Sequence, residues 1–288
     1  MPDLSSRYLD IRSYSEQLCS PLTLEDYVPQ PDFFTSPPKW HLAHTTWFFE
    51  EMVLKKHLAG YKNFHDDFSY LFNSYYNTVG ERTLRNHRGV ITRPGVEEVY
   101  KYRAYVDQHM KKLLMSDFSD EVKVLVTLGL NHEQQHQELL LTDLKYTLSL
   151  NPLDPVYKKD LDLTATRSES KGFVKIEEGV YEIGFQGDGF CFDNELGRHK
   201  VYLNEYEISE KLVTNGEYAE FIAEGGYQNF RFWLDEGWAW VNDNRRKAPL
   251  YWVKKDGDWF VYTFSGLKPL ELEEELCHIS YYEATAFA

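Results

Sequence analysis

Residues 119–146, SDEVKVLVTLGLNHEQQHQELLLTDLKY, decide how the first half of this chain folds. Ser119 is a favourable helix N-cap, and Asp120 and Glu121 follow it in the first turn, where negative charge stabilises the helix dipole. The apolar residues that follow recur with the spacing of one helix face. The stretch therefore predicts one long helix from about Ser119 to Tyr146.

Three further helices are predicted on the N-terminal side of this stretch. The first covers roughly Leu4–Cys19, and the third follows Pro94 and covers Val96–Leu114. The second begins at Ser36, which is a favourable N-cap and is followed by two prolines that a first helical turn tolerates, and it continues to about Leu54. Four helices of this length predict a helical bundle over residues 1–150.

The second half of the chain differs from the first in its composition and in its pattern of apolar residues. Residues 151–172 are polar and contain two prolines, which indicates an interdomain linker. Beyond Gly172, alternating runs such as FVKIEEGVYEIGF (173–185) and HKVYLNEYEI (199–208) predict strands, whereas residues 225–244 are aromatic and are expected to be irregular. We therefore expect an α+β chain, with a second domain over residues 173–288. Because Ala288 falls inside a predicted helix, we expect this domain to be truncated here.

Composition and charge exclude several classes of function. The chain has 288 residues, 42% of them hydrophobic, and a formal net charge of −15. This charge argues against a nucleic-acid partner, because backbone phosphates require clustered Lys and Arg. No apolar run is long enough to span a membrane, so no membrane partner is expected. Three widely spaced cysteines give no disulfide framework, which favours a reducing cytoplasm.

The strongest chemical signal is the pair His132 and His136 on the long predicted helix. A spacing of four residues places both imidazoles on one helix face, together with Leu125, Leu128 and Leu139. Buried imidazoles need partners, and one metal ion would satisfy both. The alternative is a surface or partner-facing histidine pair, since this spacing also occurs by chance.

A third ligand is available in WHLAHTTWFFEE, residues 40–51. His44 shares a helix face with Trp40 and Trp47, and His41 is an alternative one turn away. Three histidines would leave coordination positions open, as in non-haem iron sites, where a carboxylate more often completes the set. Glu138 lies two residues past His136 and could fill that role, but its helical phase points it away from the His132 face, which places it outside the direct ligand set.

HEQQH, residues 132–136, also fits the HExxH pattern of zinc metalloproteases. In that interpretation Glu133 would be the catalytic base. The long Tyr-, Asn- and Arg-rich segment at residues 61–93 would then have no role, although loops of this length are usually functional. We therefore disfavour the protease hypothesis.

Several long motifs occur in order along nearly the whole chain. They are SPPKWHLAHTTWFFE (36–50), LFNSYYN (71–77), NHEQQHQELLLTDLKY (131–146), FDNELGRHKVYL (192–203), VTNGEYAEFI (213–222), GGYQNFRFWLDEGWAW (225–240) and CHISYYEATAFA (277–288). Together they resemble the ergothioneine-biosynthesis sulfoxide synthases, or hercynine oxygenases. The resemblance implies a DinB-like helical bundle followed by a C-type-lectin-like domain of the formylglycine-generating-enzyme type.

The resemblance also implies a chemistry. Fe(II) would be held by His44, His132 and His136, which favours His44 over His41 as the third ligand. Hercynine would bind through its imidazole and a thiol, cysteine or γ-glutamylcysteine, through its sulfur. Oxygen would then drive formation of a C–S bond and a sulfoxide.

Further residues are implied by the same resemblance. Tyr75 or Tyr76 would manage proton or electron transfer near the iron. Arg85 and Arg88 would clamp the carboxylate of the thiol substrate, for which bidentate guanidinium pairing is suited. Gln135 would lie beside the bound imidazole.

Other activities stay open at this point. A relative could join histidine to cysteine, as in ovothiol synthesis, or use a selenium donor, as in selenoneine synthesis. Three histidines also suit a DinB-type thiol transferase that uses zinc or nickel without oxygen. A non-catalytic binding module is the remaining alternative. In the family, much of the hercynine pocket comes from the part of the lectin-like domain expected beyond Ala288.

Overall fold

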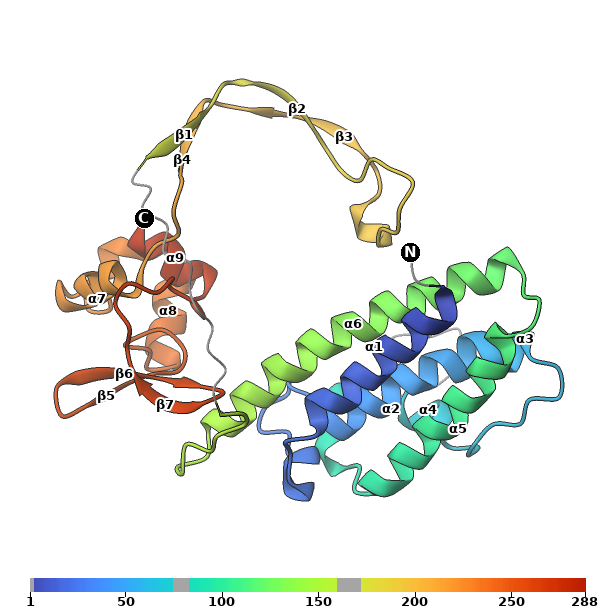
Figure 1. The fold of residues 1–288 in the computed structure, drawn as a ribbon. Coiled ribbons are helices and arrows are strands. Elements are labelled where there is room, and N and C mark those ends of the chain that lie inside the picture. The colour runs from blue at the N-terminus through green and yellow to red at the C-terminus, as the bar shows by residue number, and fades with distance from the viewer. Residues whose placement is uncertain (1–2, 75–82, 160–171) are drawn as a thin grey trace. The chain divides into compact units, whose positions relative to one another are not determined.

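The computed structural model describes residues 3–74, 83–159 and 172–288. The chain divides into two compact units, Met1–Leu153 and Asp154–Ala288, which are described separately (Figure 1). The first unit is helical and the second contains the strands. This confirms the predicted α+β class.

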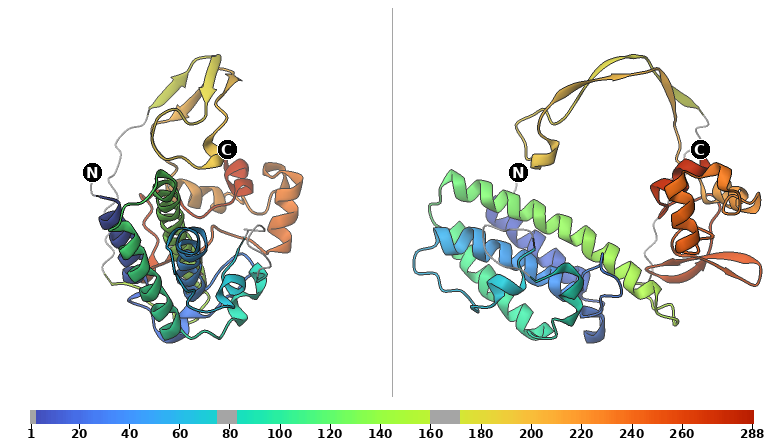
Figure 2. Two further views of the ribbon diagram at one scale, coloured as in Figure 1. Left: turned by 90° about the vertical axis from the view of Figure 1, so that its right-hand side faces the viewer. Right: turned by 180° about the vertical axis from the view of Figure 1, so that it is seen from behind.

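Four long helices build the first unit: α1 (Leu4–Cys19), α2 (Pro38–Phe48), α5 (Val96–Leu114) and α6 (Asp120–Ser149). They run alongside one another in both views of Figure 2. The side chain of Ser119 caps α6 as predicted, accepting a hydrogen bond from Val122 N at 3.3 Å. All four predicted helices are therefore present, with ends within a few residues of those expected.

The start of α2 differs from the prediction in one respect. Pro37, not Ser36, occupies the N-cap position and makes no side-chain cap. The backbone N–H of Ser36 instead donates to Asp143 Oδ2 of α6 at 2.8 Å. A carboxylate from another helix therefore replaces the expected local cap and attaches the beginning of α2 to α6.

Beyond its last turn, α2 continues as a π-helical segment, Phe49–Leu54, and then as α3 (Lys55–His57). The π-helical segment carries the buried Glu50, whose carboxylate accepts hydrogen bonds from the hydroxyls of Tyr61 and Tyr102, both at 2.6 Å. The following segment contains α4 (Phe68–Leu71) and a 3-10 helix at Arg85–Val90. The wide π turn is therefore held by hydrogen bonds from the segment after α3 and from α5.

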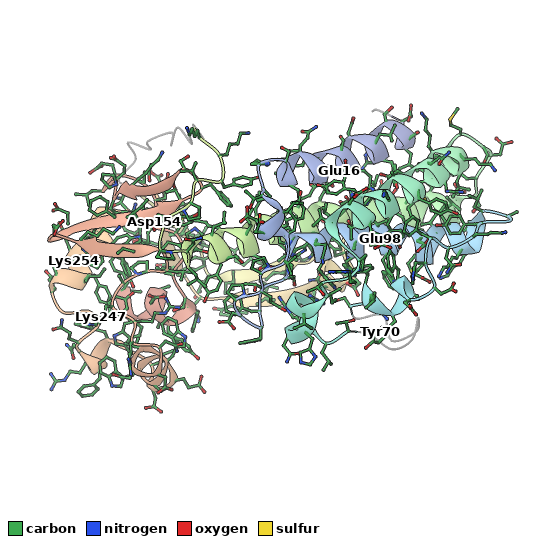
Figure 3. The ribbon with its side chains drawn as sticks, turned by 90° about the horizontal axis from the view of Figure 1, so that it is seen from below. Glu16, Tyr70, Glu98, Asp154, Lys247 and Lys254 are labelled. Carbon is green, nitrogen blue, oxygen red and sulfur yellow. The ribbon has the colours of Figure 1, made fainter. Side chains whose placement is uncertain are left out.

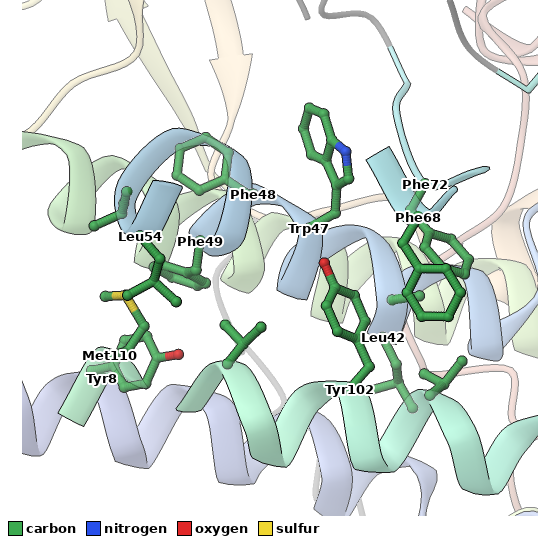
Figure 4. Close-up of a cluster of buried hydrophobic side chains, with 14 of the residues drawn as sticks. Tyr8, Leu42, Trp47, Phe48, Phe49, Leu54, Phe68, Phe72, Tyr102 and Met110 are labelled. Carbon is green, nitrogen blue, oxygen red and sulfur yellow. The ribbon is translucent and has the colours of Figure 1, made fainter. Parts of the chain in front are cut away.

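Large rings fill the core of this unit (Figure 4). Phe48 and Phe49 are fully buried and approach α6 where it carries Gly129. A Cβ atom at Gly129 would lie 2.6 Å from the Phe49 ring and 2.7 Å from the Phe48 ring. Glycine is required here because two aromatic rings occupy the space that a side chain would need.

A buried ionic network joins all four helices around Glu133, which is fully buried on α6. Arg12 of α1 donates to Glu133 Oε2 at 2.9 Å, and Arg103 of α5 donates to Oε1 at 3.1 Å. Both arginines also contact Thr46 Oγ1 of α2, at 2.9 and 3.2 Å. Ser15 completes the set by donating to Glu133 Oε1 at 2.7 Å. Every oxygen of this buried carboxylate therefore has partners, which buried charge requires.

In the second unit, residues 172–288 form three small antiparallel sheets. Strands β1 (Phe173–Ile176) and β4 (Tyr206–Ser209) pair, as do β2 (Gly179–Ile183) and β3 (His199–Leu203). These four strands form one extended two-stranded ribbon, as Figure 1 shows. The third sheet has the order β5 (Trp252–Lys255), β6 (Asp258–Thr263) and β7 (Gly266–Pro269). The strands expected in residues 173–185 and 199–208 are present.

Three helices accompany these sheets: α7 (Asn215–Ala223), α8 (Asp235–Asp243) and α9 (Tyr281–Phe287). Helix α8 corrects the expectation that residues 225–244 are irregular. Its first turn carries Asp235 and Glu236, which favour a helix N-terminus. The small core of the unit is formed by Tyr218, Tyr227, Trp233, Val241 and Ala286.

Part of the segment expected to be a linker belongs to the second unit. The hydroxyl of Tyr262 donates to Pro155 O, and Tyr157 N donates to Phe264 O at 2.9 Å. Asp154, labelled in Figure 3, forms an ion pair with Lys255 at 3.5 Å. Residues 154–158 therefore pack against the β5–β7 sheet, while residues 160–171 lie outside the described part of the chain.

Two further observations concern the chain as a whole. Across the ranges that the structure describes, no helix combines the length and apolarity needed to cross a membrane. The three cysteines, all within those ranges, are free, as expected from their spacing.

The network around Glu133 generates a stability prediction. Glu133→Gln removes the buried anion that Arg12 and Arg103 share, while Arg12 keeps Asp107 and Arg103 keeps Glu16 as partners. The free energy of unfolding should therefore fall by about 3 kcal/mol, the lower end of the cost of breaking a buried ion pair. Chemical denaturation followed by circular dichroism measures the change. Glu138→Gln, at an exposed position of the same helix, is the matched control and should change stability by less than about 0.5 kcal/mol. Equal stabilities for the two variants would contradict the role given to the network.

Candidate metal centre

Three histidines converge between α2 and α6. His44 comes from α2, and His132 and His136 come from successive turns of α6. One ring nitrogen from each lies within 4.8 Å of those of the other two. Two nitrogens bound to one ion at ordinary metal–nitrogen distances are at most about 4.2 Å apart. Small ring rotations would therefore bring all three onto a single metal ion.

The imidazole of His44 is fixed in one orientation. Its Nδ1 lies 2.6 Å from the backbone carbonyl of Phe72, which can only accept, so Nδ1 carries the proton. Trp40 and Trp47 stack against the same ring, with centroids at 4.5 and 5.6 Å. The second nitrogen, Nε2, is left with a free lone pair, which is what a metal ligand requires.

His41 contacts the triad without joining it. Its Nδ1 lies 2.9 Å from Nδ1 of His136, and its Nε2 lies 3.2 Å from Asp143 Oδ2. Because both ring nitrogens of His41 have partners in the protein, His41 has none to offer a metal. Of the two histidines of the WHLAH motif, it is His44 that converges with His132 and His136.

His132 is the least constrained ring of the three. Its Nδ1 is buried and has no hydrogen-bond partner among the described residues. The ring packs against Phe48 at 5.1 Å and against His44 at 5.1 Å. A buried nitrogen without a partner is costly, and this cost supports a ligand as the missing partner.

Burial keeps all three imidazoles neutral. It lowers the pKa of His132 to about 4, and it lowers the pKa values of His44 and His136 well below the ordinary value. The neighbouring rings add to the shift at His44 and His136, since two adjacent imidazolium ions would repel each other. Neutral imidazole is the form that binds metals, so the site is in its ligating state at neutral pH.

A cavity of about 320 Å³ opens in front of these rings. Its walls carry the three histidines together with polar and cationic groups from α2, α6 and the segment between α4 and α5. The lining residues are Ser36, Trp40, His41, His44, Ser74, Arg85, Arg88, His132, Gln135, His136, Leu139 and Asp143. The volume suits small molecules.

The two predicted clamp arginines both reach this cavity but differ in setting. Arg88 is 5% exposed, lies 3.4 Å above the centre of the Trp40 ring, and donates to the hydroxyls of Ser36 and Ser74, both at 2.9 Å. Arg85 is exposed and donates to the carbonyl of Phe34. Arg88 is therefore the more rigid of the two.

The other predicted site residues are placed as follows. Gln135 is exposed and lines the cavity, and its contact with a bound imidazole stays a prediction. Glu138 is exposed and does not line it, as its helical phase indicated. Tyr75 and Tyr76 lie outside the described residues, so their roles stay predictions.

The structure also bears on two interpretations of α6. Glu133 cannot serve as the base of a metalloprotease, because its carboxylate faces Arg12 and Arg103 in the core and not the cavity. The predicted apolar stripe of α6 is correct only in part. Leu125 and Leu128 pack against the core, whereas Leu139, expected on the same face, is 41% exposed at the cavity.

Sequence reasoning missed Asp143, Ser36 and Ser74 as parts of the site. A signal for Asp143 existed, since it follows His136 by seven residues and therefore lies on the same helix face two turns later. Ser74 had no such signal, because it comes from the segment between α4 and the Arg85–Val90 helix, whose path periodicity does not predict.

The geometry predicts metal binding by the three histidines together. Anaerobic titration with Fe(II) should give one bound ion per chain. Each of His44→Ala, His132→Ala and His136→Ala should weaken binding by more than the roughly 100-fold that loss of an outer partner costs. His87→Ala, an exposed histidine in the Arg85–Val90 helix, is the control and should bind as the wild type does. A triad variant with unchanged affinity would remove that histidine from the ligand set.

Comparison with known proteins assigns each half of the chain. Residues 7–140 match the DinB superfamily, and residues 159–288 match the Sulfatase-modifying factor enzyme 1-like domain. Among similar proteins are hercynine oxygenases from Mycolicibacterium smegmatis, 30% identical over 164 residues, and from Mycobacterium tuberculosis, 32% identical over 162 residues.

These alignments cover 56% and 55% of this chain and 37% of each relative. A hercynine oxygenase from Mycolicibacterium thermoresistibile is 30% identical over 161 residues, which are 55% of this chain and 34% of the relative. The matched region thus spans about a third of the length of these relatives. The chain thus combines a half that matches the DinB superfamily with a half that matches the sulfatase-modifying-factor type, and over part of its length it is similar to proteins named hercynine oxygenases.

Proposed function

We propose that this chain carries the iron site of a sulfoxide synthase that joins a thiol to the imidazole ring of hercynine in ergothioneine biosynthesis. One observation carries the proposal: three neutral imidazoles converge at a cavity that also contains a buried guanidinium. The names of the relatives, hercynine oxygenases, support the choice of substrate.

The donor set fits Fe(II). Three imidazole nitrogens without any thiolate suit iron, and they leave further coordination positions open. When bound, Fe(II) would supply positions at which the hercynine imidazole, the thiol sulfur and O2 meet. Asp143, a carboxylate that lines the cavity, already accepts hydrogen bonds from Ser36 and His41, so it does not compete as a ligand.

The proposed reaction balances with O2 as the only oxidant. A C–H bond of the imidazole and the S–H bond of the thiol are broken, and a C–S bond forms. One oxygen atom becomes the sulfoxide oxygen and the other leaves as water with the two hydrogen atoms. Each of the two oxidations, C–S bond formation and sulfoxidation, removes two electrons, and O2 accepts all four.

Within the cavity, we assign the thiol's carboxylate to Arg88 and Arg85. Arg88 has the fixed, planar guanidinium that bidentate carboxylate recognition requires, because Trp40 and two serine hydroxyls hold it. Arg85, at the exposed side, would contribute long-range attraction. The thiol substrate is accordingly cysteine or γ-glutamylcysteine.

The remaining predicted residues keep proposed roles. Gln135 would contact the hercynine imidazole from α6. Tyr75 or Tyr76 would supply a hydroxyl proton near the reacting sulfur. The reducing cytoplasm is the proposed location, since it maintains both Fe(II) and free thiols.

Arg88→Lys tests the clamp. Lysine keeps the charge but loses the planar fork and the stacking on Trp40, so the KM for the thiol should rise by about tenfold or more, given that a charged hydrogen bond contributes about 1.5–3 kcal/mol. Iron content should stay that of the wild type. Oxygen uptake with hercynine and cysteine, with product mass read in parallel, measures this on the full-length protein. The exposed Arg93→Lys is the matched control.

The outcomes separate the proposals. Uptake that requires both substrates and yields a sulfoxide adduct supports the sulfoxide synthase. An unchanged KM in Arg88→Lys would contradict the clamp alone. A protein that binds zinc or nickel and transfers thiols without consuming oxygen would contradict the iron chemistry and favour the thiol transferase.

A further inference from the structure

We propose that Asp143 and His41 form a positioning relay that holds the His136 ring with its proton on Nδ1 and its Nε2 lone pair free for the metal. The inference rests on the proposed metal site for its purpose. Its central claim, the protonated nitrogen of His136, concerns the protein alone.

The relay begins at Asp143 of α6, which is 7% exposed. Its Oδ2 lies 2.8 Å from the backbone N–H of Ser36, a group that can only donate. The same oxygen lies 3.2 Å from Nε2 of His41. Because a carboxylate oxygen accepts, His41 must carry its proton on Nε2.

The direction of the next contact follows from this. The proposal takes His41 in its neutral form, in which a proton on Nε2 leaves Nδ1 bare, and a bare Nδ1 can only accept a hydrogen bond. Nδ1 of His41 lies 2.9 Å from Nδ1 of His136. His136 must therefore be the donor, with its proton on Nδ1 and no proton on Nε2.

The three histidines of the triad differ in which group accepts a hydrogen bond from Nδ1 and so fixes the proton there. His44 uses a backbone carbonyl, that of Phe72, which no side-chain substitution removes. His132 has no partner at Nδ1 among the described residues. At His136 alone the acceptor is a side chain, whose own direction depends on Asp143. Substitution of His41 or Asp143 can therefore change which ring nitrogen of His136 carries the proton.

The relay also reaches the proposed substrate clamp. Ser36, whose N–H anchors Asp143, accepts a hydrogen bond from Arg88 through its hydroxyl at 2.9 Å. One residue at the start of α2 thus contacts both the group that orients a metal ligand and the guanidinium that lines the cavity.

Three substitutions separate the steps of the relay. His41→Phe removes the acceptor of His136. Asp143→Leu removes the acceptor of His41. Asp143→Asn is the conservative variant, because the N–H of Ser36 selects the amide oxygen for the same position and His41 keeps an acceptor there.

Long-range ¹H–¹⁵N NMR of the metal-free, full-length protein, labelled at histidine nitrogens, reads the protonation of each ring directly. We expect His136 to be protonated at Nδ1 in the wild type and in Asp143→Asn. In His41→Phe and Asp143→Leu we expect it to shift toward protonation at Nε2. Affinity for Co(II), used as the probe metal, should fall about 10–100-fold in these two variants and much less in Asp143→Asn.

Leu144→Ala is the matched control for loss of stability alone, since Leu144 is buried beside Asp143 in sequence and does not line the cavity. It should lower the melting temperature without changing either readout. Protonation of wild-type His136 at Nε2, an unchanged His136 in His41→Phe, or an equal loss of Co(II) affinity in Leu144→Ala would overturn the relay. Because no substrate is present, these results are independent of the proposed oxygenase activity.

Discussion

The arrangement of the helical unit depends on one buried carboxylate, Glu133, held between Arg12 and Arg103. A charge without solvent is tolerated only if its partners are fixed, so this carboxylate determines the position of α1 and α5 against α6. The helical period then fixes where the neighbouring side chains point. Because Glu133 faces the core, His132, one residue earlier, and His136, three residues later, face the cavity.

The site keeps its ionised and neutral groups apart although they are neighbours in sequence. On the core side of α6, Glu133 lies between two guanidinium groups, which outweigh the effect of burial and hold the pKa of its carboxyl below the ordinary value. On the cavity side, burial lowers the pKa of every imidazole. The cavity therefore presents neutral nitrogen donors on one side and the cationic Arg88 on another.

Much of this arrangement was predictable from the sequence. Caps and periodicity located the four helices, and the four-residue spacing of His132 and His136 placed both on one face. Periodicity could not show where along α6 the predicted stripe leaves the core: Leu125 and Leu128 pack against it, whereas Leu139 is exposed at the cavity. Periodicity also gave no reason to bury Arg12 and Arg103, because arginine is usually exposed and is buried only with partners that come from other helices.

The contacts that orient the histidines could not be predicted from the sequence either, because they too involve partners from other elements. The choice between His41 and His44 depends on which ring nitrogens the protein already occupies, and those partners, Asp143 and Phe72, come from other elements. The start of α2 shows the same effect, since a tertiary contact from Asp143 replaced the local cap expected at Ser36. Local rules predict elements, whereas hydrogen-bond partners from distant segments decide the chemistry of the site.

The central claim is that three imidazoles of this chain hold one Fe(II). X-ray absorption at the iron edge tests it most directly, because multiple scattering from imidazole rings counts histidine ligands. The account predicts three imidazoles for the Fe(II)-loaded protein and a fourth when hercynine is added. Fewer than three imidazoles, or a first shell dominated by sulfur, would contradict it.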